Sequence, residues 1–293
     1  MKIALFGINM GALSDPARAL KVAQFAEAAG IESLWAGEHI VLPEPRVAPS
    51  PLPADYPMLD PNICFAWLAG QTKSIRFGTG IIILPQRNPL VLAKEIASLD
   101  VLSNGRIMFG VGIGYLKSEF DALGIPFADK AARSLEYLEA MRAIWSEEAP
   151  SYTGKFVSFS GVQARPRPLQ QPGPPVVFGG HVAGAFERSV THAQGWYGYG
   201  LDLEGTAKCL DGLRLAASQL ERPASLGKLE ISVTPSADFN LDSAKRFADL
   251  GVDRLVVLFP KRSKGELFSA TKDQEALDFV ARLGEEFVDR IET

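Results

Sequence analysis

The run RFGTGIIILPQRNPLVLAKEIASLDVLSNGRIMFGVGIG, residues 76–114, reads as a strand, a helix and a second strand in succession. Arg76–Leu84 is rich in isoleucine and leucine and predicts a buried strand. Pro89–Leu102 predicts a helix that stops at Asn104-Gly105, since these residues tolerate the left-handed backbone found at helix ends. Arg106–Val111 predicts the next strand. This order is typical of a parallel β-α-β unit.

The same alternation continues on both sides of this unit. Apolar runs predict further strands at Lys2–Ile8, Ser33–Ala36, Val176–Phe178, Gly195–Tyr199, Leu229–Thr234 and Arg254–Phe259. Helices are predicted from Asp15-Pro16 to Gly30 and at Ala131–Trp145, Ala183–His192, Glu204–Gln219, Ser243–Leu250 and Asp273–Ile291. Eight strands alternating with helices predict an α/β fold, a (β/α)8 TIM barrel with loop insertions, as a single domain over residues 1–293. An open, doubly wound sheet is the alternative, but it more often has about five to seven strands.

Two segments interrupt the alternation. Pro43–Pro61 contains seven prolines, which argues against a helix or a central strand. Because long loops in compact domains are commonly functional or disordered, we expect this segment to form a partly mobile flap over the substrate side. The second insertion, Ser151–Pro175, includes a hairpin-like stretch at Lys155–Ser160.

Composition and charge exclude several classes of protein. Thirty Lys and Arg against thirty-four Asp and Glu give a net charge of −4, without the basic footprint of a nucleic-acid binder. No apolar stretch approaches the ~18 residues of a membrane span, and the start MKIALFGINMG is too weakly apolar for a secretory signal. We therefore expect a soluble, cytoplasmic protein. Cys64 and Cys209 are far apart and the three histidines lack ligand spacing, so no metal site is expected.

Familiar catalytic motifs are missing from the sequence. It contains no GxSxG, no GxxxxGK[ST] and no HExxH. Gly110–Gly114 resembles a dinucleotide-binding fingerprint, but Tyr115 occupies the position of the last required glycine. Two interpretations remain open for this segment. It is either a plain tight turn or a loop in which glycine lets the backbone approach a flat ring or a phosphate.

Two further segments lie where a barrel would place its site. Gly179-Gly180-His181 separates a strand from a helix, so its backbone N–H groups could hold a phosphate, although an ordinary turn explains it too. Glu38-His39 ends the second strand, at the carboxyl face where barrel enzymes bind substrates. A lone histidine is more often structural than catalytic, and the position is what favours function here.

Taken in order, these segments resemble the luciferase-like monooxygenase superfamily of flavin and deazaflavin oxidoreductases. The matching segments are Leu34–His39, Phe77–Ile81, Asn88-Pro89 with the helix through Leu102–Arg106, Gly110–Tyr115 with Glu119-Phe120, Tyr137–Trp145, Pro174-Pro175 with Phe178–Gly180, and Gly195-Trp196. The chain is most similar to the branch that uses the 5-deazaflavin coenzyme F420. The resemblance implies an insertion-bearing TIM barrel, often a homodimer, with the cofactor ring across the carboxyl ends of the strands. It also implies a non-prolyl cis peptide at Gly80–Ile81.

The resemblance also assigns residues to the site. It implies cofactor contacts at Glu38, His39, Gly80, Ile81, Gly112, Ile113, Gly114, Ser118, Gly179, Gly180 and His181. His39 and Tyr115 are the candidates for handling a proton. In the sugar-phosphate dehydrogenases of this branch a catalytic glutamate follows the glycine turn, whereas here that position is Tyr115. A phenol is a poor substitute for a carboxylate at neutral pH, so a small hydrophobic or conjugated substrate is the better expectation.

Three functions stay open at this point. The first is hydride transfer between F420 and a small organic substrate. The second is an FMN-dependent monooxygenase supplied by a separate reductase, and the third is a barrel that binds a ligand without converting it. F420 has a long acidic tail that needs a basic channel. Arg165 and Arg167 could line such a channel, but a solvated loop explains them as well.

Overall fold

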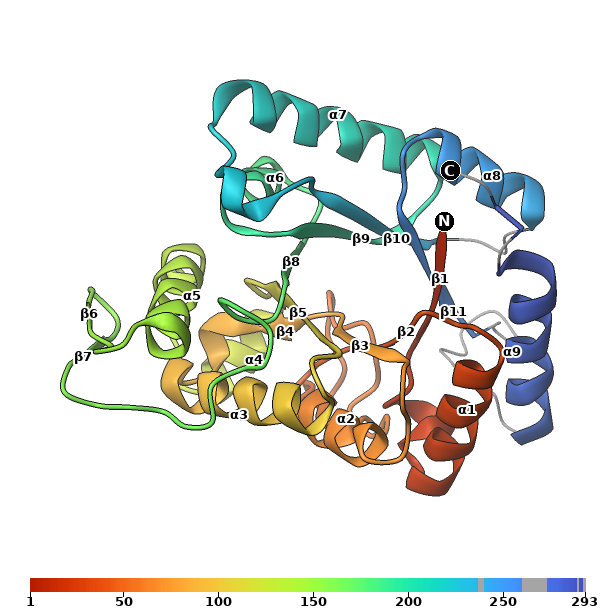
Figure 1. The fold of residues 1–293 in the computed structure, drawn as a ribbon, viewed down its shortest axis with the longest axis horizontal. Helices are drawn as coiled ribbons and strands as arrows, with labels where there is room; N and C mark the ends of the chain where they lie inside the picture. Colours follow the sequence, from red (N-terminus) through yellow and green to blue (C-terminus); the bar gives the residue numbers. More distant parts are fainter. Residues whose placement is uncertain (237–239, 260–272, 289, 292–293) are drawn as a thin grey trace.

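The computed structural model describes residues 1–236, 240–259, 273–288 and 290–291. Parallel strands pair side by side around a closed barrel, and the last of them returns to the first (Figure 1). In order these strands are β1 (Lys2–Phe6), β2 (Ser33–Ala36), β3 (Arg76–Thr79), β5 (Ile107–Gly112), β8 (Val176–Gly179), β9 (Gly195–Leu201), β10 (Glu230–Pro235) and β11 (Arg254–Leu258). The predicted (β/α)8 TIM barrel is confirmed.

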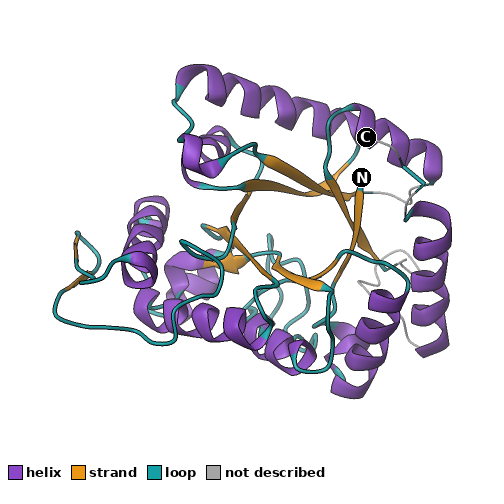
Figure 2. Ribbon diagram, viewed as in Figure 1, coloured by secondary structure: helices purple, strands orange, loops and turns teal. Residues whose placement is uncertain are grey.

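Helices cover the outside of the barrel (Figure 2). They are α1 (Pro16–Ala28), α2 (Pro61–Ala69), α3 (Pro89–Leu102), α4 (Lys117–Ala122), α5 (Lys130–Ser146), α6 (Ala183–His192), α7 (Leu203–Gln219), α8 (Leu241–Asp249) and α9 (Asp273–Phe287). In the part of the chain that the structure describes, none of these helices has the length and apolar character needed to cross a bilayer.

Three of the helices begin with the same local device. Asp15, Asp60 and Asn88 each precede the proline that opens α1, α2 or α3, and each side chain accepts hydrogen bonds from backbone N–H groups of the first turn. Proline suits the first helical position because its missing N–H would have no intrahelical partner there. Helices α2 and α4 were not predicted. The α2 sequence PNICFAWLA is apolar on all sides and shows no helical period.

The third strand is interrupted where a single strand, Arg76–Leu84, was expected. Strand β3 ends at Thr79, the Gly80–Ile81 peptide bond is cis, and β4 (Ile82–Ile83) resumes the pairing with β5. The cis bond implied by the family resemblance is therefore present. The short 3-10 helix Leu84–Gln86 follows at once, so Leu84 lies outside the strand.

Close packing between β3 and β5 explains one glycine of the quoted segment. A Cβ atom added to Gly110 would lie 1.7 Å from the carbonyl oxygen of Thr79. Only glycine permits this approach of two backbones. The hydroxyl of Thr79 in turn donates to the Gly110 carbonyl at 2.7 Å.

The buried side chains form a layer inside the barrel and larger layers between barrel and helices. The inner layer consists of Ala4, Phe6, Met10, Trp35, Met108, Val177, Tyr197 and Val256. Both cysteines of the chain, Cys64 and Cys209, are buried in the outer layer as free thiols. Burial, with a small contribution from Asp60, raises the pKa of Cys64 to about 12.

The proline-rich loop, residues 43–61, is tied down at its far end. Met58 forms a β-bridge with Met10, and Asn9 exchanges hydrogen bonds of 2.7 and 2.8 Å with the backbone of Leu59. Tyr56 and Met58 pack against the inner apolar layer of the barrel. The loop therefore contacts the carboxyl end of the barrel, and its mobility stays a prediction.

The second insertion carries the predicted hairpin with shifted bounds. Its strands are β6 (Tyr152–Thr153) and β7 (Ser158–Phe159), so the hairpin starts earlier than Lys155. This insertion connects the end of α5 to the start of β8, which places it at the amino end of the barrel.

Most remaining boundaries agree with the sequence within two residues. The first strand ends at Phe6 instead of Ile8, because Gly7 turns the chain with a φ of 92°. Helix α8 begins at Leu241, two residues early, because Asn240 and Ser243 cap each other reciprocally. The last helix was expected over Asp273–Ile291 and ends at Phe287, while residue 289 lies outside the described residues.

Candidate active site

Three side chains meet at the carboxyl end of the barrel, one after β2 and two after β5. Nδ1 of His39 lies 3.4 Å from Oε2 of Glu119, and Nε2 lies 3.5 Å from the hydroxyl of Tyr115. The rings of His39 and Tyr115 meet edge to face at 6.0 Å. The structure thus brings the two predicted proton-handling residues together and adds a carboxylate behind them.

Glu119 is buried and bonds to the chain that follows β2. Its side chain is wholly inaccessible, and its Oε1 accepts from the backbone N–H groups of Ile40 at 2.6 Å and Val41 at 3.4 Å. The same carboxylate therefore holds both the backbone after His39 and the imidazole itself.

Tyr115 is the exposed end of this group. Half of its surface is accessible. Partial burial of the hydroxyl and the nearby Glu119 carboxylate raise the pKa of Tyr115. At neutral pH the phenol is consequently protonated and can donate a hydrogen bond.

Glu38 belongs to a second, fully occupied group. Its Oε2 accepts from the backbone N–H of Ile83 at 2.6 Å, and its Oε1 binds both Nε and Nη2 of Arg87. Arg87 also reaches Asp60 at 2.5 Å. Burial raises the pKa of Glu38 even though Arg87 opposes it. In this structure Glu38 fixes the chain just beyond the cis bond, and its predicted contact with a cofactor would have to be made alongside these bonds.

Ile81 and the glycine turns form an apolar platform. The Ile81 side chain lies directly over Gly112 and close to Gly179, where added Cβ atoms would come within 1.8 and 3.1 Å of it. Ile113 and Gly114 are half-buried at the end of β5. Predicted site residues from three strands are therefore adjacent.

Two neighbours of this turn carry polar groups. Lys130 donates to the carbonyl of Gly114 at 2.9 Å. The hydroxyl of Ser118 is buried and has no hydrogen-bond partner among the described residues. A bound group with a polar edge would satisfy it.

The Gly179-Gly180-His181 turn leads directly into α6. Gly180 has a φ of 131°, which side-chain-bearing residues rarely adopt, and its N–H donates to the carbonyl of Tyr197 at 3.3 Å. Nε2 of His181 accepts from the backbone N–H of Tyr199 at 3.1 Å. Burial lowers the pKa of His181, so the imidazole stays neutral at pH 7. This is the form that can accept that hydrogen bond.

The start of α6 differs from most of the helix starts. Side chains cap the starts of α1, α2, α3, α7 and α8, whereas the residues before α4, α5 and α6 supply no side-chain cap. Within the described chain the first N–H groups of α6 have no side-chain acceptor. An anion at this position would find both the donors and the positive end of the helix dipole.

Aromatic side chains line the same end of the barrel. The ring centroids of Phe6 and Tyr199 lie 5.3 Å apart with their planes tilted by 54°, and those of Tyr199 and Tyr197 lie 6.4 Å apart. Burial, together with the neighbouring phenols Tyr115 and Tyr56, raises the pKa of Tyr199. The lining is therefore apolar with neutral hydroxyl groups.

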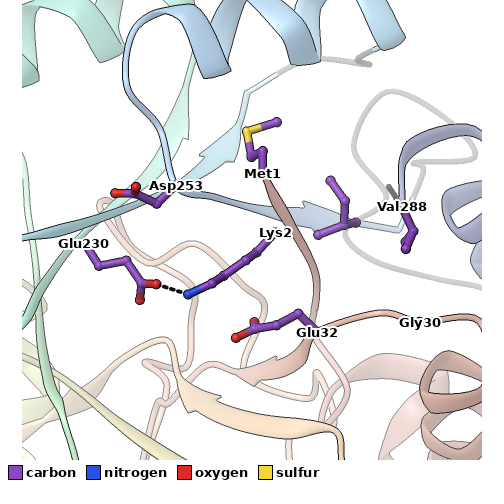
Figure 3. A pocket seen from close by; sticks show the side chains of 8 residues that line it. Met1, Lys2, Gly30, Glu32, Glu230, Asp253 and Val288 are labelled. Carbon is purple, nitrogen blue, oxygen red and sulfur yellow. Dashed lines mark hydrogen bonds and ion pairs between the residues drawn. The ribbon is translucent and has the colours of Figure 1, made fainter. Parts of the chain in front are cut away.

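A hollow lies at the opposite, amino end of the barrel (Figure 3). It has a volume of about 400 Å³ and is lined by Met1, Lys2, Ile3, Gly30, Glu32, Glu230, Asp253 and Val288. Its carboxylates already have partners. Buried Arg254 binds Glu32 through two bonds of 2.9 Å and Glu230 through one of 2.7 Å, and Lys228 pairs with Asp253. The charged groups that line this hollow are therefore already paired with one another or with their neighbours.

Sequence reasoning missed Glu119 as a functional group and missed Arg87 altogether. Of the two arginines considered for a basic channel, Arg167 does not line the site, and the backbone carbonyl of Arg165 accepts from Lys94 on α3. Arg167 instead donates to the carbonyls of Ser146 and Glu147 at the end of α5, at the amino end of the barrel. No group of three potential metal ligands occurs among the residues described.

Comparison with known proteins supports the family assignment. The sequence model for the luciferase-like monooxygenases matches residues 4–279. An uncharacterised protein of Mycobacterium tuberculosis is 33% identical over 251 residues, which cover 82% of this chain and 86% of the relative.

Two solved structures share the fold at low sequence identity. The coenzyme F420-dependent tetrahydromethanopterin reductase of Methanopyrus kandleri superposes with a TM-score of 0.73 at 15% identity, covering 100% of this chain and 99% of the other. The FMN-bound oxygenating constituent of 3,6-diketocamphane monooxygenase from Pseudomonas putida superposes with a TM-score of 0.75 at 16% identity, with the same coverage.

Proposed function

Because the chain belongs to the luciferase-like monooxygenase family, we propose that it is a coenzyme F420-dependent oxidoreductase that transfers a hydride between the deazaflavin and a small organic substrate. The observation that carries this proposal is the group formed by His39, Tyr115 and Glu119 beside the Ile81 platform. It supplies a proton-handling pair at the end of the barrel that carries the apolar Ile81 platform, and hydride transfer to or from the carbon of an alcohol or carbonyl group needs such a proton exchange at the oxygen.

The residues at the carboxyl end fit a deazaflavin. Ile81, with Gly80, Gly112 and Ile113 beside it, would support the ring, and the buried Ser118 hydroxyl would find a partner on it. The Gly179-Gly180-His181 turn and the uncapped start of α6 would hold a phosphate. A bound deazaflavin supplies a carbon that gives or accepts a hydride.

The side chains of this protein would supply orientation, exclusion of water and proton exchange. The platform would hold the ring in place, the aromatic lining would exclude water, and Tyr115 with His39 would exchange the proton at the substrate oxygen. Glu38 with Arg87 would act indirectly, by holding the backbone beyond the cis bond.

The substrate class follows from the lining. Phe6 packs against Tyr199, the phenols of Tyr56 and Tyr115 lie near Tyr199, and the position after the glycine turn carries the neutral phenol of Tyr115. We therefore propose a small, uncharged, hydrophobic or conjugated substrate instead of a sugar phosphate.

An FMN-dependent monooxygenase is the second candidate. The uncapped start of α6 would suit the single phosphate of FMN as well as that of F420. Of the two arginines that were considered for a tail channel, Arg167 lies at the other end of the barrel. The position of Arg167 favours FMN, because the long acidic tail of F420 would need basic partners near the site.

A pair of titrations separates the candidates. The intrinsic fluorescence of the purified protein is followed while F420 or FMN is added, and oxidation of each reduced cofactor is then measured with and without oxygen over a panel of aldehydes, ketones and conjugated enones. Tighter binding of F420, with substrate-dependent and oxygen-independent oxidation, supports the proposal. Tighter binding of FMN with oxygen consumption assigns the monooxygenase, and no binding of either supports a ligand-binding barrel. The homodimer stays a prediction, which light scattering tests.

A further inference from the structure

His39 is held from two sides by groups of different chemistry. Its Nδ1 faces the Glu119 carboxylate at 3.4 Å, and its Nε2 faces the Tyr115 hydroxyl at 3.5 Å. A carboxylate can only accept a hydrogen bond, so the nitrogen that faces Glu119 carries the hydrogen. In a neutral imidazole the other nitrogen then presents a lone pair, to which Tyr115 donates.

We propose that Glu119 is a positioning residue that fixes His39 as its Nδ1–H tautomer, so that Nε2 accepts the Tyr115 proton and Tyr115 is the group that meets the substrate. This inference rests on the proposed function. The accessible surface of the two residues supports Tyr115 as the group nearer to the substrate, because the side chain of His39 is only 10% accessible whereas Tyr115 is 50% accessible. Both hydrogen bonds are long, and such bonds commonly shorten once substrate is bound.

In this relay, every proton that one group loses is gained by the next group. During oxidation of an alcohol, the substrate hydroxyl would give its proton to the Tyr115 oxygen, the Tyr115 proton would pass to Nε2 of His39, and a bound oxidised deazaflavin would be the acceptor of the substrate hydride. His39 gains one positive charge, which faces the negative charge of Glu119. Reduction of a carbonyl would run the same proton transfers backwards, with a bound reduced deazaflavin as the hydride donor.

The two oxygens of Glu119 have separate partners, which makes a selective substitution possible. Oε1 accepts from the N–H groups of Ile40 and Val41, and Oε2 faces His39. In Glu119→Gln the amide oxygen would keep the two backbone donors, so the amide NH2 would face Nδ1. A donor at that position requires a lone pair on Nδ1 and therefore favours the opposite tautomer, with hydrogen on Nε2.

The tautomer can be observed directly, without cofactor or substrate. The chain has three histidines, so long-range ¹H–¹⁵N NMR correlations resolve each ring, and a His39→Asn sample assigns the His39 signals. We expect Nδ1–H in the wild type and Nε2–H in Glu119→Gln. The wild-type spectrum alone overturns the proposal if His39 carries its hydrogen on Nε2, even should the variant fail to fold.

Glu136→Gln is a matched control. Glu136 also accepts from backbone N–H groups, those of Lys155, Phe156 and Val157, and none of its partners among the described residues is a histidine. It should leave the His39 tautomer and the turnover unchanged, whereas Glu119→Gln should lower kcat by about 10²-fold or more with little change in cofactor binding. An unchanged tautomer in folded Glu119→Gln refutes the inference. If Glu119→Gln switches the tautomer but the wild-type protein turns over no substrate, the proposed function is refuted and the positioning role of Glu119 is kept.

Discussion

The two ends of the barrel use similar side chains in opposite ways. At the amino end, Arg254 is fully buried and donates to Glu32, Glu230 and Ser232 at 2.7 to 3.3 Å. At the carboxyl end, His39 meets its partners at 3.4 and 3.5 Å, and Tyr115 is half-exposed. Groups whose hydrogen bonds are complete stabilise a fold, whereas groups with spare donors or acceptors can bind and react.

The end of the barrel at which a polar group lies does not by itself decide whether the group stabilises the fold or can react. Glu38 also lies at the carboxyl end, yet Arg87 and the Ile83 N–H occupy both of its oxygens. It resembles the amino-end network more than it resembles His39. What separates the two kinds of group is therefore whether their polar atoms already have all their hydrogen-bond partners. Substitutions in each kind should have different effects on stability and on turnover.

The largest expected effect is on stability at the amino end. Arg254→Leu leaves Glu32 and Glu230 without their buried partner, and such losses typically cost about 3–5 kcal/mol of unfolding free energy. Urea denaturation measures it. Arg214→Leu is the control, because Arg214 pairs with Asp211 in solvent and should cost at most about 1 kcal/mol. Equal stability of the two variants would contradict the role given to Arg254.

The matching effect at the carboxyl end is on turnover. His39→Asn keeps some hydrogen bonding but cannot carry the proton, so kcat should fall about 10²–10⁴-fold while the unfolding free energy changes by less than about 1 kcal/mol. Steady-state kinetics with the best substrate among the aldehydes, ketones and conjugated enones measure kcat. Tyr115→Phe is the paired variant. A loss there with none at His39 would transfer the proton role to Tyr115 alone, and a loss of cofactor affinity in His39→Asn would make His39 a cofactor contact.

The third test uses pH. Burial opposes ionisation of Glu32, but Arg254 and Ser33 outweigh it and lower the pKa of this carboxyl from 4.5 to about 2. The folded protein thus binds the proton less well than the unfolded chain does. The resulting stability, roughly 3 kcal/mol at most, is present above pH 4.5 and is lost as the pH falls towards 2. Glu32→Gln should flatten the unfolding free energy across this window, and an unchanged pH slope would contradict the assignment.

The smallest expected effect concerns the turn before α6. Gly180→Ala forces a side chain into a φ of 131° and brings its Cβ within 2.9 Å of Ala185. We expect roughly tenfold weaker binding of the preferred cofactor in the fluorescence titration, or about 1.4 kcal/mol. Gly124→Ala is the control, since Gly124 also has a positive φ but open space around it. Equal cofactor affinity in both variants would remove the turn from the cofactor site.

The sequence predicted all eight barrel strands because each is a short apolar run next to a turn. Helix α2 escaped because its apolar residues have no helical period, although Asp60-Pro61 repeats the start signal of Asp15-Pro16. Positions at strand ends located His39, Tyr115 and the glycine turns. Glu119 and Arg87 could not be placed in the same way, because their partners lie 80 and 49 residues away along the chain. Such pairings depend on how the barrel closes.

The two buried thiols have a practical consequence for experiments on the proline-rich loop. A thiol reacts through its accessible thiolate. Cys64, with a pKa of about 12, and Cys209, whose pKa burial also raises, should resist labelling at neutral pH. A cysteine substituted for Val47, which is 49% exposed in the loop, would then take up a maleimide dye selectively. Anisotropy of that dye would report whether the loop opens and closes during turnover, with both native cysteines left in place.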